Sequence, residues 1–204
     1  PDIPILGEEE GGKKQATQWI VDPLDGTTNF VHGFPSYSVS IALMVDSELR
    51  VGCIVDGVSG DVYAATQDGG ATRNQTPIQV SQTKYLKDSL LLTGFPYDRH
   101  KHAAFYLKSV EAFMIRAQGI RRAGSAAMDL AHIASGRADG YWEFGLSPWD
   151  IAAGTLLVSE AGGCVTNMSG QPLDIYAPRL LVSNAQIHQD MIHVLNEVNL
   201  TSNS

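Results

Sequence analysis

Residues 19–30 read Trp-Ile-Val-Asp-Pro-Leu-Asp-Gly-Thr-Thr-Asn-Phe, and this stretch carries the strongest structural signal in the chain. Its apolar start predicts a short strand. Pro23 cannot donate to a ladder, so the strand is expected to stop there and the chain to turn. Two carboxylates three residues apart, Asp22 and Asp25, are then expected to project from the strand end into one space.

Two carboxylates held that close repel each other unless something neutralises them, and a hard divalent cation with oxygen ligands is the usual partner. Gly26 and Thr27 follow at once. Glycine allows a close backbone approach to a ligand, and the next N–H groups can face an anion as at a helix N-terminus. The stretch therefore predicts metal carboxylates beside a phosphate cradle. A plain turn is the alternative, because Asp, Pro and Gly are all turn formers.

The sequence after this stretch is at first rich in strands. Runs of β-branched residues predict strands at 38–45, 50–55 and 61–66. Turn residues at 57–60 separate the last two, so 37–66 is expected to form an antiparallel meander.

The later part of the chain alternates strands with helices. Strands are predicted at 89–93, 139–144, 163–166 and 180–183, and helices at 100–118, 124–135, 150–161 and 185–198. This order predicts a layered sandwich of the α+β or α/β class. Residues 1–204 are expected to form a single domain, with an antiparallel-sheet part at 1–88 and an α/β part at 89–204.

Composition narrows the function classes. The chain has 204 residues, 44% hydrophobic and 18% charged, and a net charge of −8, which is ordinary for a globular protein. The acidic balance argues against a nucleic-acid partner but not against an anionic substrate, because bound metal ions can invert the local field. No apolar run reaches the ~20 residues of a membrane helix. No signal peptide is visible, so no membrane partner and a cytoplasmic location are expected.

Three segments together resemble the signatures of the inositol monophosphatase family. Residues 19–30 resemble the first signature, and 147–154 (Ser-Pro-Trp-Asp-Ile-Ala-Ala-Gly) followed by 159–163 resemble the second. Gly-Glu-Glu at 7–9 resembles the upstream metal-binding glutamate motif. Order and separation match over essentially the whole chain. The resemblance implies a sugar-phosphatase fold of alternating α-β-α-β-α layers, here with the N-terminal helices missing, since the chain opens directly before the glutamate motif.

The resemblance also implies which residues form the site. The metal ligands would be Glu8, Asp22, the Leu24 carbonyl, Asp25 and Asp150. Glu8 and Thr27 would place the attacking water, Asp22 and Asp25 would be shared between metal ions, and the amides of Gly26 and Thr27 would hold phosphate. The sugar or cyclitol part of the substrate would meet Gly124, Ser125, Ala126, Glu143 and Asp150.

Several of these residues have a simpler structural interpretation. Asp150, ahead of an apolar helix, is a candidate N-cap. Glu143 is a candidate rim charge, and residues 124–127 suit tight helix packing. Residues 8–10 form an acidic run that is solvated by default, and only the family pattern selects Glu8 among them.

These features predict a Mg²⁺-dependent phosphomonoesterase with two to three Mg²⁺ ions, hydrolysing inositol 1-phosphate with a metal-activated water and no phosphoenzyme. Lithium sensitivity and a homodimer are implied by the resemblance alone. Fructose 1,6-bisphosphatase, or a histidinol or other small sugar phosphatase of the same superfamily, is the alternative. A regulatory binding protein with a vestigial site is an alternative of another class, against which the intact carboxylate set argues.

Overall fold

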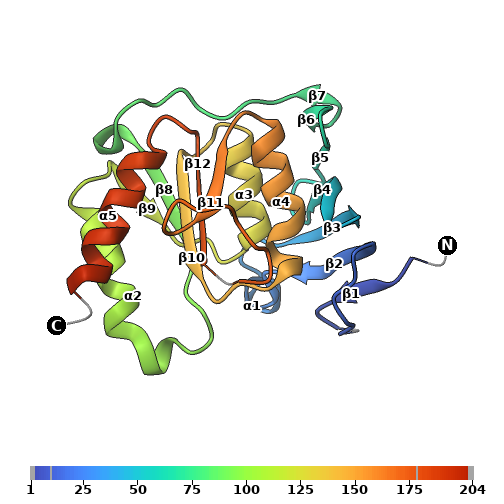
Figure 1. Ribbon diagram of the computed structural model, residues 1–204, viewed down its shortest axis with the longest axis horizontal. Coiled ribbons are helices and arrows are strands. Elements are labelled where there is room, and N and C mark those ends of the chain that lie inside the picture. The colour runs from blue at the N-terminus through green and yellow to red at the C-terminus, as the bar shows by residue number, and fades with distance from the viewer. Residues whose placement is uncertain (1–2, 10, 178, 202–204) are drawn as a thin grey trace.

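The computed structural model describes residues 3–9, 11–177 and 179–201, which form two β-sheets with helices between them and on one outer face (Figure 1). The layers follow the order sheet, helices, sheet, helices. The predicted alternation of sheet and helical layers is thereby confirmed.

The first sheet has seven strands that lie side by side in chain order: β1 (Ile5–Gly7), β2 (Gln18–Asp25), β3 (Ser38–Val45), β4 (Glu48–Asp56), β5 (Val62–Thr66), β6 (Gly70–Arg73) and β7 (Thr76–Pro77). β1 runs parallel to β2, and every later pair is antiparallel. Along β3, buried residues alternate with half-buried ones, as one covered face requires. The predicted meander over 37–66 is therefore confirmed.

The sequence predicts that this strand stops at Pro23. In the structure, β2 instead continues to Asp25. Asp22 pairs with Ser40 and Asp25 with Ser38, so β2 holds one extra residue here and forms a β-bulge. A proline in a bulge removes no ladder hydrogen bond, because one residue of the bulge is unpaired anyway. The predicted turn at Pro23 is therefore wrong.

The second sheet has five strands in the order β11 (Cys164–Asn167), β12 (Arg179–Ser183), β10 (Gly140–Phe144), β8 (Leu90–Thr93) and β9 (Gly119–Arg121). β10, β8 and β9 are mutually parallel, whereas β12 is antiparallel to both of its neighbours. Parallel neighbours need crossover connections, and helices supply them here.

Two helices, α3 (Ala126–Ala134) and α4 (Pro148–Glu160), fill the space between the sheets. Nearly all of their residues are buried in one apolar core with both sheets. The two helices pack so closely that Gly154 of α4 has no room for a side chain. A Cβ at this position would lie 2.4 Å from a methyl carbon of Leu130 in α3. The middle of α4 is thereby packed closely against α3.

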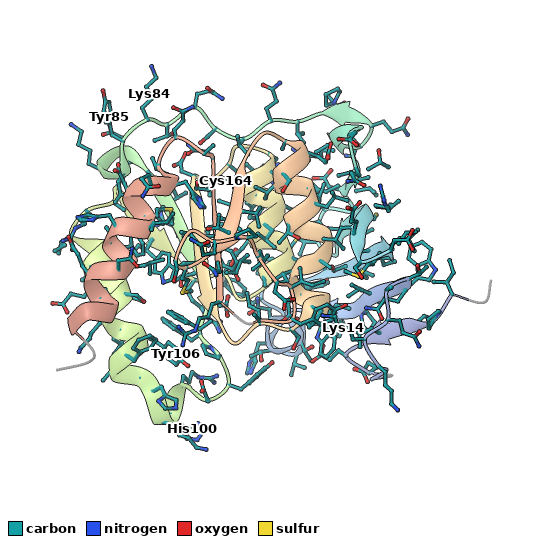
Figure 2. All side chains as sticks on the ribbon, viewed as in Figure 1. Lys14, Lys84, Tyr85, His100, Tyr106 and Cys164 are labelled. Atoms are coloured by element: carbon teal, nitrogen blue, oxygen red, sulfur yellow. The ribbon has the colours of Figure 1, made fainter. Side chains whose placement is uncertain are left out.

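Two further helices, α2 (Arg99–Met114) and α5 (His188–Thr201), cover the other face of the second sheet. Phe113 of α2 stacks on Trp142 of β10 at 4.3 Å between ring centroids, and Met191 of α5 joins the same cluster. The segment between β7 and β8 holds a 3-10 turn, η1 (Leu86–Asp88), and Lys84 and Tyr85 project outward from it (Figure 2).

The four long helices lie within a few residues of their predicted ranges. Five short elements were not predicted from the sequence: the strands β1, β6, β7 and β9 and the six-residue helix α1 (Thr27–His32). None of the helices in the described part of the chain combines the length and apolar character needed to cross a membrane.

Candidate functional site

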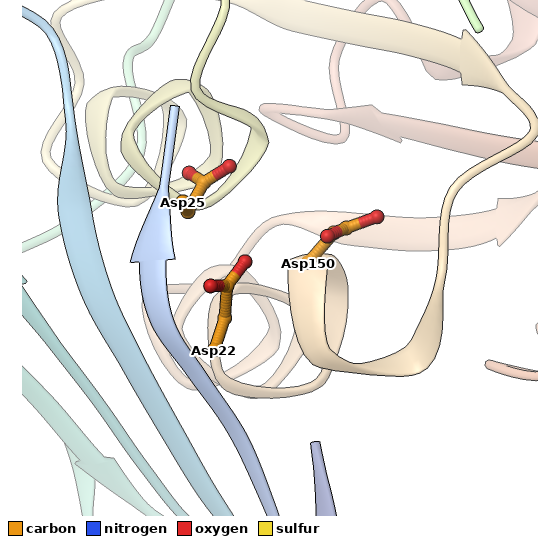
Figure 3. A group of neighbouring side chains, drawn as sticks. All are labelled: Asp22, Asp25 and Asp150. Carbon is orange, nitrogen blue, oxygen red and sulfur yellow. The ribbon is translucent and has the colours of Figure 1, made fainter. Parts of the chain in front are cut away.

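Three acidic side chains converge where β2 ends and α4 begins (Figure 3). Asp22, Asp25 and Asp150 each offer a carboxylate oxygen, and these oxygens lie within 4.8 Å of one another. In a regular strand, residues three apart point to opposite faces. The bulge in β2 adds one residue, so Asp22 and Asp25 both turn to the buried face.

Asp25 is fixed by donors from two distant parts of the chain. Its Oδ2 accepts hydrogen bonds from the Ala127 N–H at 2.9 Å and the Ser38 hydroxyl at 3.4 Å. The Ser125 hydroxyl donates to the same oxygen. Ser125 is also the N-cap of α3, so the helix start and the carboxylate are positioned together.

The other two acids are held by local backbone donors. Asp22 Oδ1 accepts from the Leu24 N–H at 2.9 Å, and Asp150 Oδ2 accepts from the Ser147 N–H at 2.6 Å. Ser147 is the N-cap of α4, and Asp150 is the third residue of the helix. Asp150 is therefore not the N-cap; the spacing Ser147 to Asp150 is that of a capping box, in which the third residue bonds back to the cap.

Burial and mutual repulsion make the three acids hard to ionise together. Burial, opposed by the Leu24 hydrogen bond and assisted by the nearby charges of Asp25 and Glu8, raises the pKa of Asp22 to about 7. Burial also raises the pKa of Asp150 to about 8, with the Asp25 and Asp22 charges adding to it. The pKa of Asp25 is raised by burial as well, against the hydrogen bonds it accepts.

The acids line a cleft of about 420 Å³, called here the carboxylate cleft. Ten of the eleven residues predicted to form the site line it: Glu8, Asp22, Leu24, Asp25, Gly26, Thr27, Gly124, Ala126, Glu143 and Asp150. The exception is Ser125, which is buried and contacts the site through Asp25. Chain segments far apart in sequence thus meet in one hollow.

Glu143 of β10 lies half-buried in the wall of this cleft. The Tyr141 hydroxyl donates to its Oε2, and burial raises the pKa of Glu143 to about 7 against the charge of Arg122. Gly94 makes room for it, because a Cβ there would lie 2.0 Å from that oxygen. Glu143 therefore belongs to the wall of the cleft. The alternative interpretation from the sequence, an exposed charge at the rim, is wrong.

Other residues of the site carry no local sequence signal. Ser38 reaches Asp25 only because β3 pairs with β2, and Gly94 matters only because Glu143 occupies the space of its missing side chain. Arg99 and Arg122 line the cleft and supply its positive charge. Ser147 is the exception, because its spacing of three residues from Asp150 is the sequence signal of a capping box.

A larger hollow of about 570 Å³ lies elsewhere, between β3, α4 and the loop that carries Tyr176. Lys14 sits over the Tyr176 ring at 3.8 Å from its centroid. Among the described residues, no group of three acidic, His or Cys side chains gathers in its lining as it does in the carboxylate cleft. The chemistry of the lining, and not size, therefore identifies the site.

The donor set of the carboxylate cleft fits a divalent metal ion. Hard cations such as Mg²⁺ and Ca²⁺ take carboxylate and carbonyl oxygens. The three aspartates provide such oxygens at mutual distances that one or more ions can bridge. Burial raises the pKa values of the three acids and mutual repulsion adds to those of Asp22 and Asp150, and a bound cation would favour the charged carboxylates against both effects.

Comparisons with known proteins agree with this geometry. The model of the inositol monophosphatase family matches residues 1–200. The chain is 45% identical over 198 residues to a Synechocystis protein named inositol-1-monophosphatase, and 43% identical over 173 residues to a Vibrio cholerae protein named Nus factor SuhB. These alignments cover 96% and 83% of this chain, and the chain spans 69% and 65% of the two relatives' lengths.

The fold also matches that of solved structures. The structure of inositol monophosphatase from Anabaena superposes with a TM-score of 0.93 and 44% sequence identity, covering 97% of this chain and 79% of that one. Sequence and structure therefore place this chain in the inositol monophosphatase family.

Proposed function

We propose that this chain is a Mg²⁺-dependent phosphomonoesterase that hydrolyses inositol 1-phosphate. The observation that supports it most is the convergence of Asp22, Asp25 and Asp150 in a cleft that is large enough for a small ligand and is lined by polar groups. Asp22, Asp25, Asp150, Glu8 and the Leu24 carbonyl would hold two to three Mg²⁺ ions.

Bound Mg²⁺ ions would lower the pKa of a bound water molecule and neutralise charge on the phosphoryl oxygens. The protein has to place that water. Thr27 Oγ donates its proton to the Leu24 carbonyl at 2.9 Å, so its lone pairs are left to accept a hydrogen bond from water. The Glu8 carboxylate lies in the same cleft and would accept the second hydrogen bond. The two side chains would orient the water for in-line attack.

The phosphate would lie against the start of α1. Gly26 precedes this helix with φ 86°, and its missing side chain lets the chain pass close to the Ser36 carbonyl. The first N–H groups of a helix have no partner within the helix, so those near Thr27 are available to phosphate oxygens.

The cyclitol part would lie against Gly124, Ala126 and Glu143, where the Glu143 carboxylate can accept hydrogen bonds from ring hydroxyls. A relative named inositol-1-monophosphatase supports this substrate. Arg99 and Arg122 also line the cleft, and they would suit the second phosphate of fructose 1,6-bisphosphate. This ester is therefore the alternative substrate.

A second candidate function rests on the relative named Nus factor SuhB, a name that does not describe a phosphatase. A binding role would not need the three acids to stay close and buried at the cost of their mutual repulsion. Their retention favours the enzyme. The homodimer and the lithium sensitivity stay predictions, which light scattering and inhibition by LiCl would test.

The test is phosphate release from inositol 1-phosphate by this chain, titrated with Mg²⁺ from zero, with fructose 1,6-bisphosphate in parallel. We expect Mg²⁺-dependent release that favours the inositol ester. Preference for the bisphosphate would replace the substrate but keep the reaction class. A chain that unfolds cooperatively and binds Mg²⁺, yet releases phosphate from neither ester, would overturn the enzyme proposal in favour of the binding role.

A further inference from the structure

The side chain of Glu143 lies in the wall of the carboxylate cleft, and the proposed function gives its carboxylate to the ring hydroxyls of the substrate. A glutamate side chain rotates about several bonds. If the ligand itself has to fix such a side chain, the lost freedom weakens binding, whereas a side chain that is fixed in advance binds more tightly. The groups that hold Glu143 therefore bear on which substrates the cleft accepts.

Tyr141 provides the hydrogen bond that holds this carboxylate. Tyr141 and Glu143 lie two residues apart on β10, so their side chains stand on the same face of the second sheet. The Tyr141 hydroxyl donates to Oε2 of Glu143. Across residues 3–9, 11–177 and 179–201, the hydroxyl makes no other hydrogen bond. The bond therefore joins one buried donor to one acceptor in the cleft wall.

The ring that carries this hydroxyl is fixed by packing. Tyr141 is fully buried in the apolar core that α3 and α4 form with both sheets. Its strand, β10, is paired on both sides, with β8 and with β12. A phenylalanine would fill the same space, and a hydroxyl in such a core is costly unless it is paired. The bond to Glu143 is thus what the hydroxyl adds to the packing of the ring.

A second feature shapes the space for the same carboxylate. A Cβ on Gly94 would lie 2.0 Å from Oε2 of Glu143 and 2.3 Å from Oε1, so the carboxylate fills the space of the missing side chain. The Thr93 hydroxyl, one residue earlier, donates to the Trp142 carbonyl at 2.8 Å and ties this segment to β10. Glu143 is therefore enclosed by one neighbouring strand and bonded from its own.

We propose that Tyr141 is a positioning residue for substrate recognition, whose hydroxyl occupies Oε2 of Glu143 and leaves Oε1 to accept hydrogen bonds from the hydroxyls of a polyol phosphate. This inference rests on the proposed function and deepens it, because it concerns the alcohol part of the ester. Tyr141 is fully buried, so it acts through Glu143 and not by touching the substrate. An ester whose alcohol part carries no hydroxyl group should not depend on Tyr141.

The kinetic test is Tyr141→Phe, which removes the hydroxyl and keeps the ring. KM and kcat would be measured with Mg²⁺ for inositol 1-phosphate and, in parallel, for 4-nitrophenyl phosphate, which has no hydroxyl group to donate. KM for the inositol ester should rise about fivefold, with kcat changed by less than about twofold, because the lost interaction is with the non-reacting part. Both constants for 4-nitrophenyl phosphate should stay within about twofold of the parent values.

Tyr63→Phe is the matched control. Tyr63 is also fully buried, in β5 of the first sheet, and its hydroxyl has no hydrogen-bond partner among the described residues. Both variants lose one buried hydroxyl from an aromatic ring in the core, but only Tyr141→Phe loses a bond to the cleft. KM of Tyr63→Phe should stay within about twofold of the parent value for both esters. Thermal unfolding of both variants would check the fold.

A double variant separates positioning from a general effect on the structure. Glu143→Ala should raise KM for inositol 1-phosphate by about tenfold or more, because a hydrogen bond to a charged group is lost. If Tyr141 acts through Glu143, adding Tyr141→Phe to Glu143→Ala should change KM by less than about twofold. If the tyrosine acts through packing alone, its full fivefold effect should appear in the double variant as well, and the proposal would be overturned.

A crystal structure of Tyr141→Phe tests the same inference without catalysis. The Glu143 carboxylate should leave its place beside Gly94 or occupy more than one rotamer, and an unchanged, single rotamer would overturn the positioning role. An equal rise in KM for both esters would also overturn it. If the parent chain releases phosphate from neither ester, the proposed function fails, and the crystal structure still decides whether Tyr141 holds Glu143.

Discussion

The carboxylate cleft and a hollow lined by Arg121, Arg122 and Arg137 share one wall residue, Arg122, but they hold opposite charge in different ways. The acids of the cleft are largely buried and fixed by backbone and hydroxyl donors. The three arginines of the other hollow are exposed side chains of this chain. Buried like charges cost far more than solvated ones. The cleft is therefore the stronger sign of a ligand, and variants there should have the larger effects.

The largest effect is expected from Asp25→Asn, which removes one charge from the metal set while keeping the size of the side chain. Loss of the outer partners of metal ligands already costs about 10–100-fold. Loss of a ligand itself should lower kcat for inositol 1-phosphate by more than about a hundredfold. Asp68→Asn is the control, an exposed residue with φ 61°, which asparagine tolerates. Retention of more than about a tenth of the parent kcat would contradict a bridging role for Asp25.

The next effect concerns stability without metal. The folded protein keeps protons on Asp22 up to a pKa of about 7 and on Asp150 up to about 8, whereas the unfolded chain releases them near 3.8. The stability that these protons give is complete below pH 4 and is lost as pH rises towards 8. In EDTA, the free energy of unfolding should be lower at pH 9 than at pH 5 by about 2 kcal/mol or more.

Urea unfolding at the two pH values measures this difference. Mg²⁺ should restore stability at pH 9, because a cation replaces the protons as the neutralising charge. The variant Asp150→Asn should reduce the pH dependence. Equal stability at both pH values in EDTA would show that the three acids are less strongly coupled than their burial indicates.

A matched pair of serine variants tests how Asp25 is held. Ser125 and Ser38 both donate to Asp25 Oδ2, but the Ser38 bond is long at 3.4 Å. Ser125→Ala should lower kcat by about tenfold, and Ser38→Ala by less than about threefold. Ser125 also caps α3, so its variant should lose about 1 kcal/mol of stability, to be measured separately. Equal kinetic effects would mean that the two donors position the carboxylate equally.

The smallest effect is expected at the substrate wall. In Gly94→Ala the new Cβ would collide with the Glu143 carboxylate, which must move. KM for inositol 1-phosphate should rise about fivefold with little change in kcat, since the interaction is with the non-reacting part of the substrate. Steady-state kinetics measures both constants. A fall in kcat with unchanged KM would instead place Glu143 among the groups that act on the reacting atoms.

Part of the cleft could be predicted from local signals, and the rest only from the resemblance to the family signatures. Asp22 and Asp25 flank a proline and precede a glycine, and Asp150 lies just ahead of the apolar run of a helix. The predicted end of β2 was wrong for a physical reason. The bulge in β2 depends on its register with β3, and no local sequence pattern reveals that register. Ser38 and Gly94 were missed because their roles arise from contacts across the fold.

The hollow lined by Arg121, Arg122 and Arg137 could not be predicted at all. Arg121, Arg122 and Arg137 look like ordinary surface charges along the chain. Asp129 lies inside an apolar helix, and its missing hydrogen-bond partner is visible only in three dimensions. Groups that meet from separate segments of the chain leave no pattern in the sequence.

The most direct test of the central claim, that the three aspartates form a metal centre, is a calorimetric titration of the EDTA-treated and dialysed chain with Mg²⁺ at pH 8, in parallel with Asp25→Asn and Asp150→Asn. The account predicts saturable Mg²⁺ binding by the parent chain and binding weakened by about tenfold or more in each variant. Folded parent protein that binds no Mg²⁺, or variants that bind it as tightly as the parent, would contradict the claim.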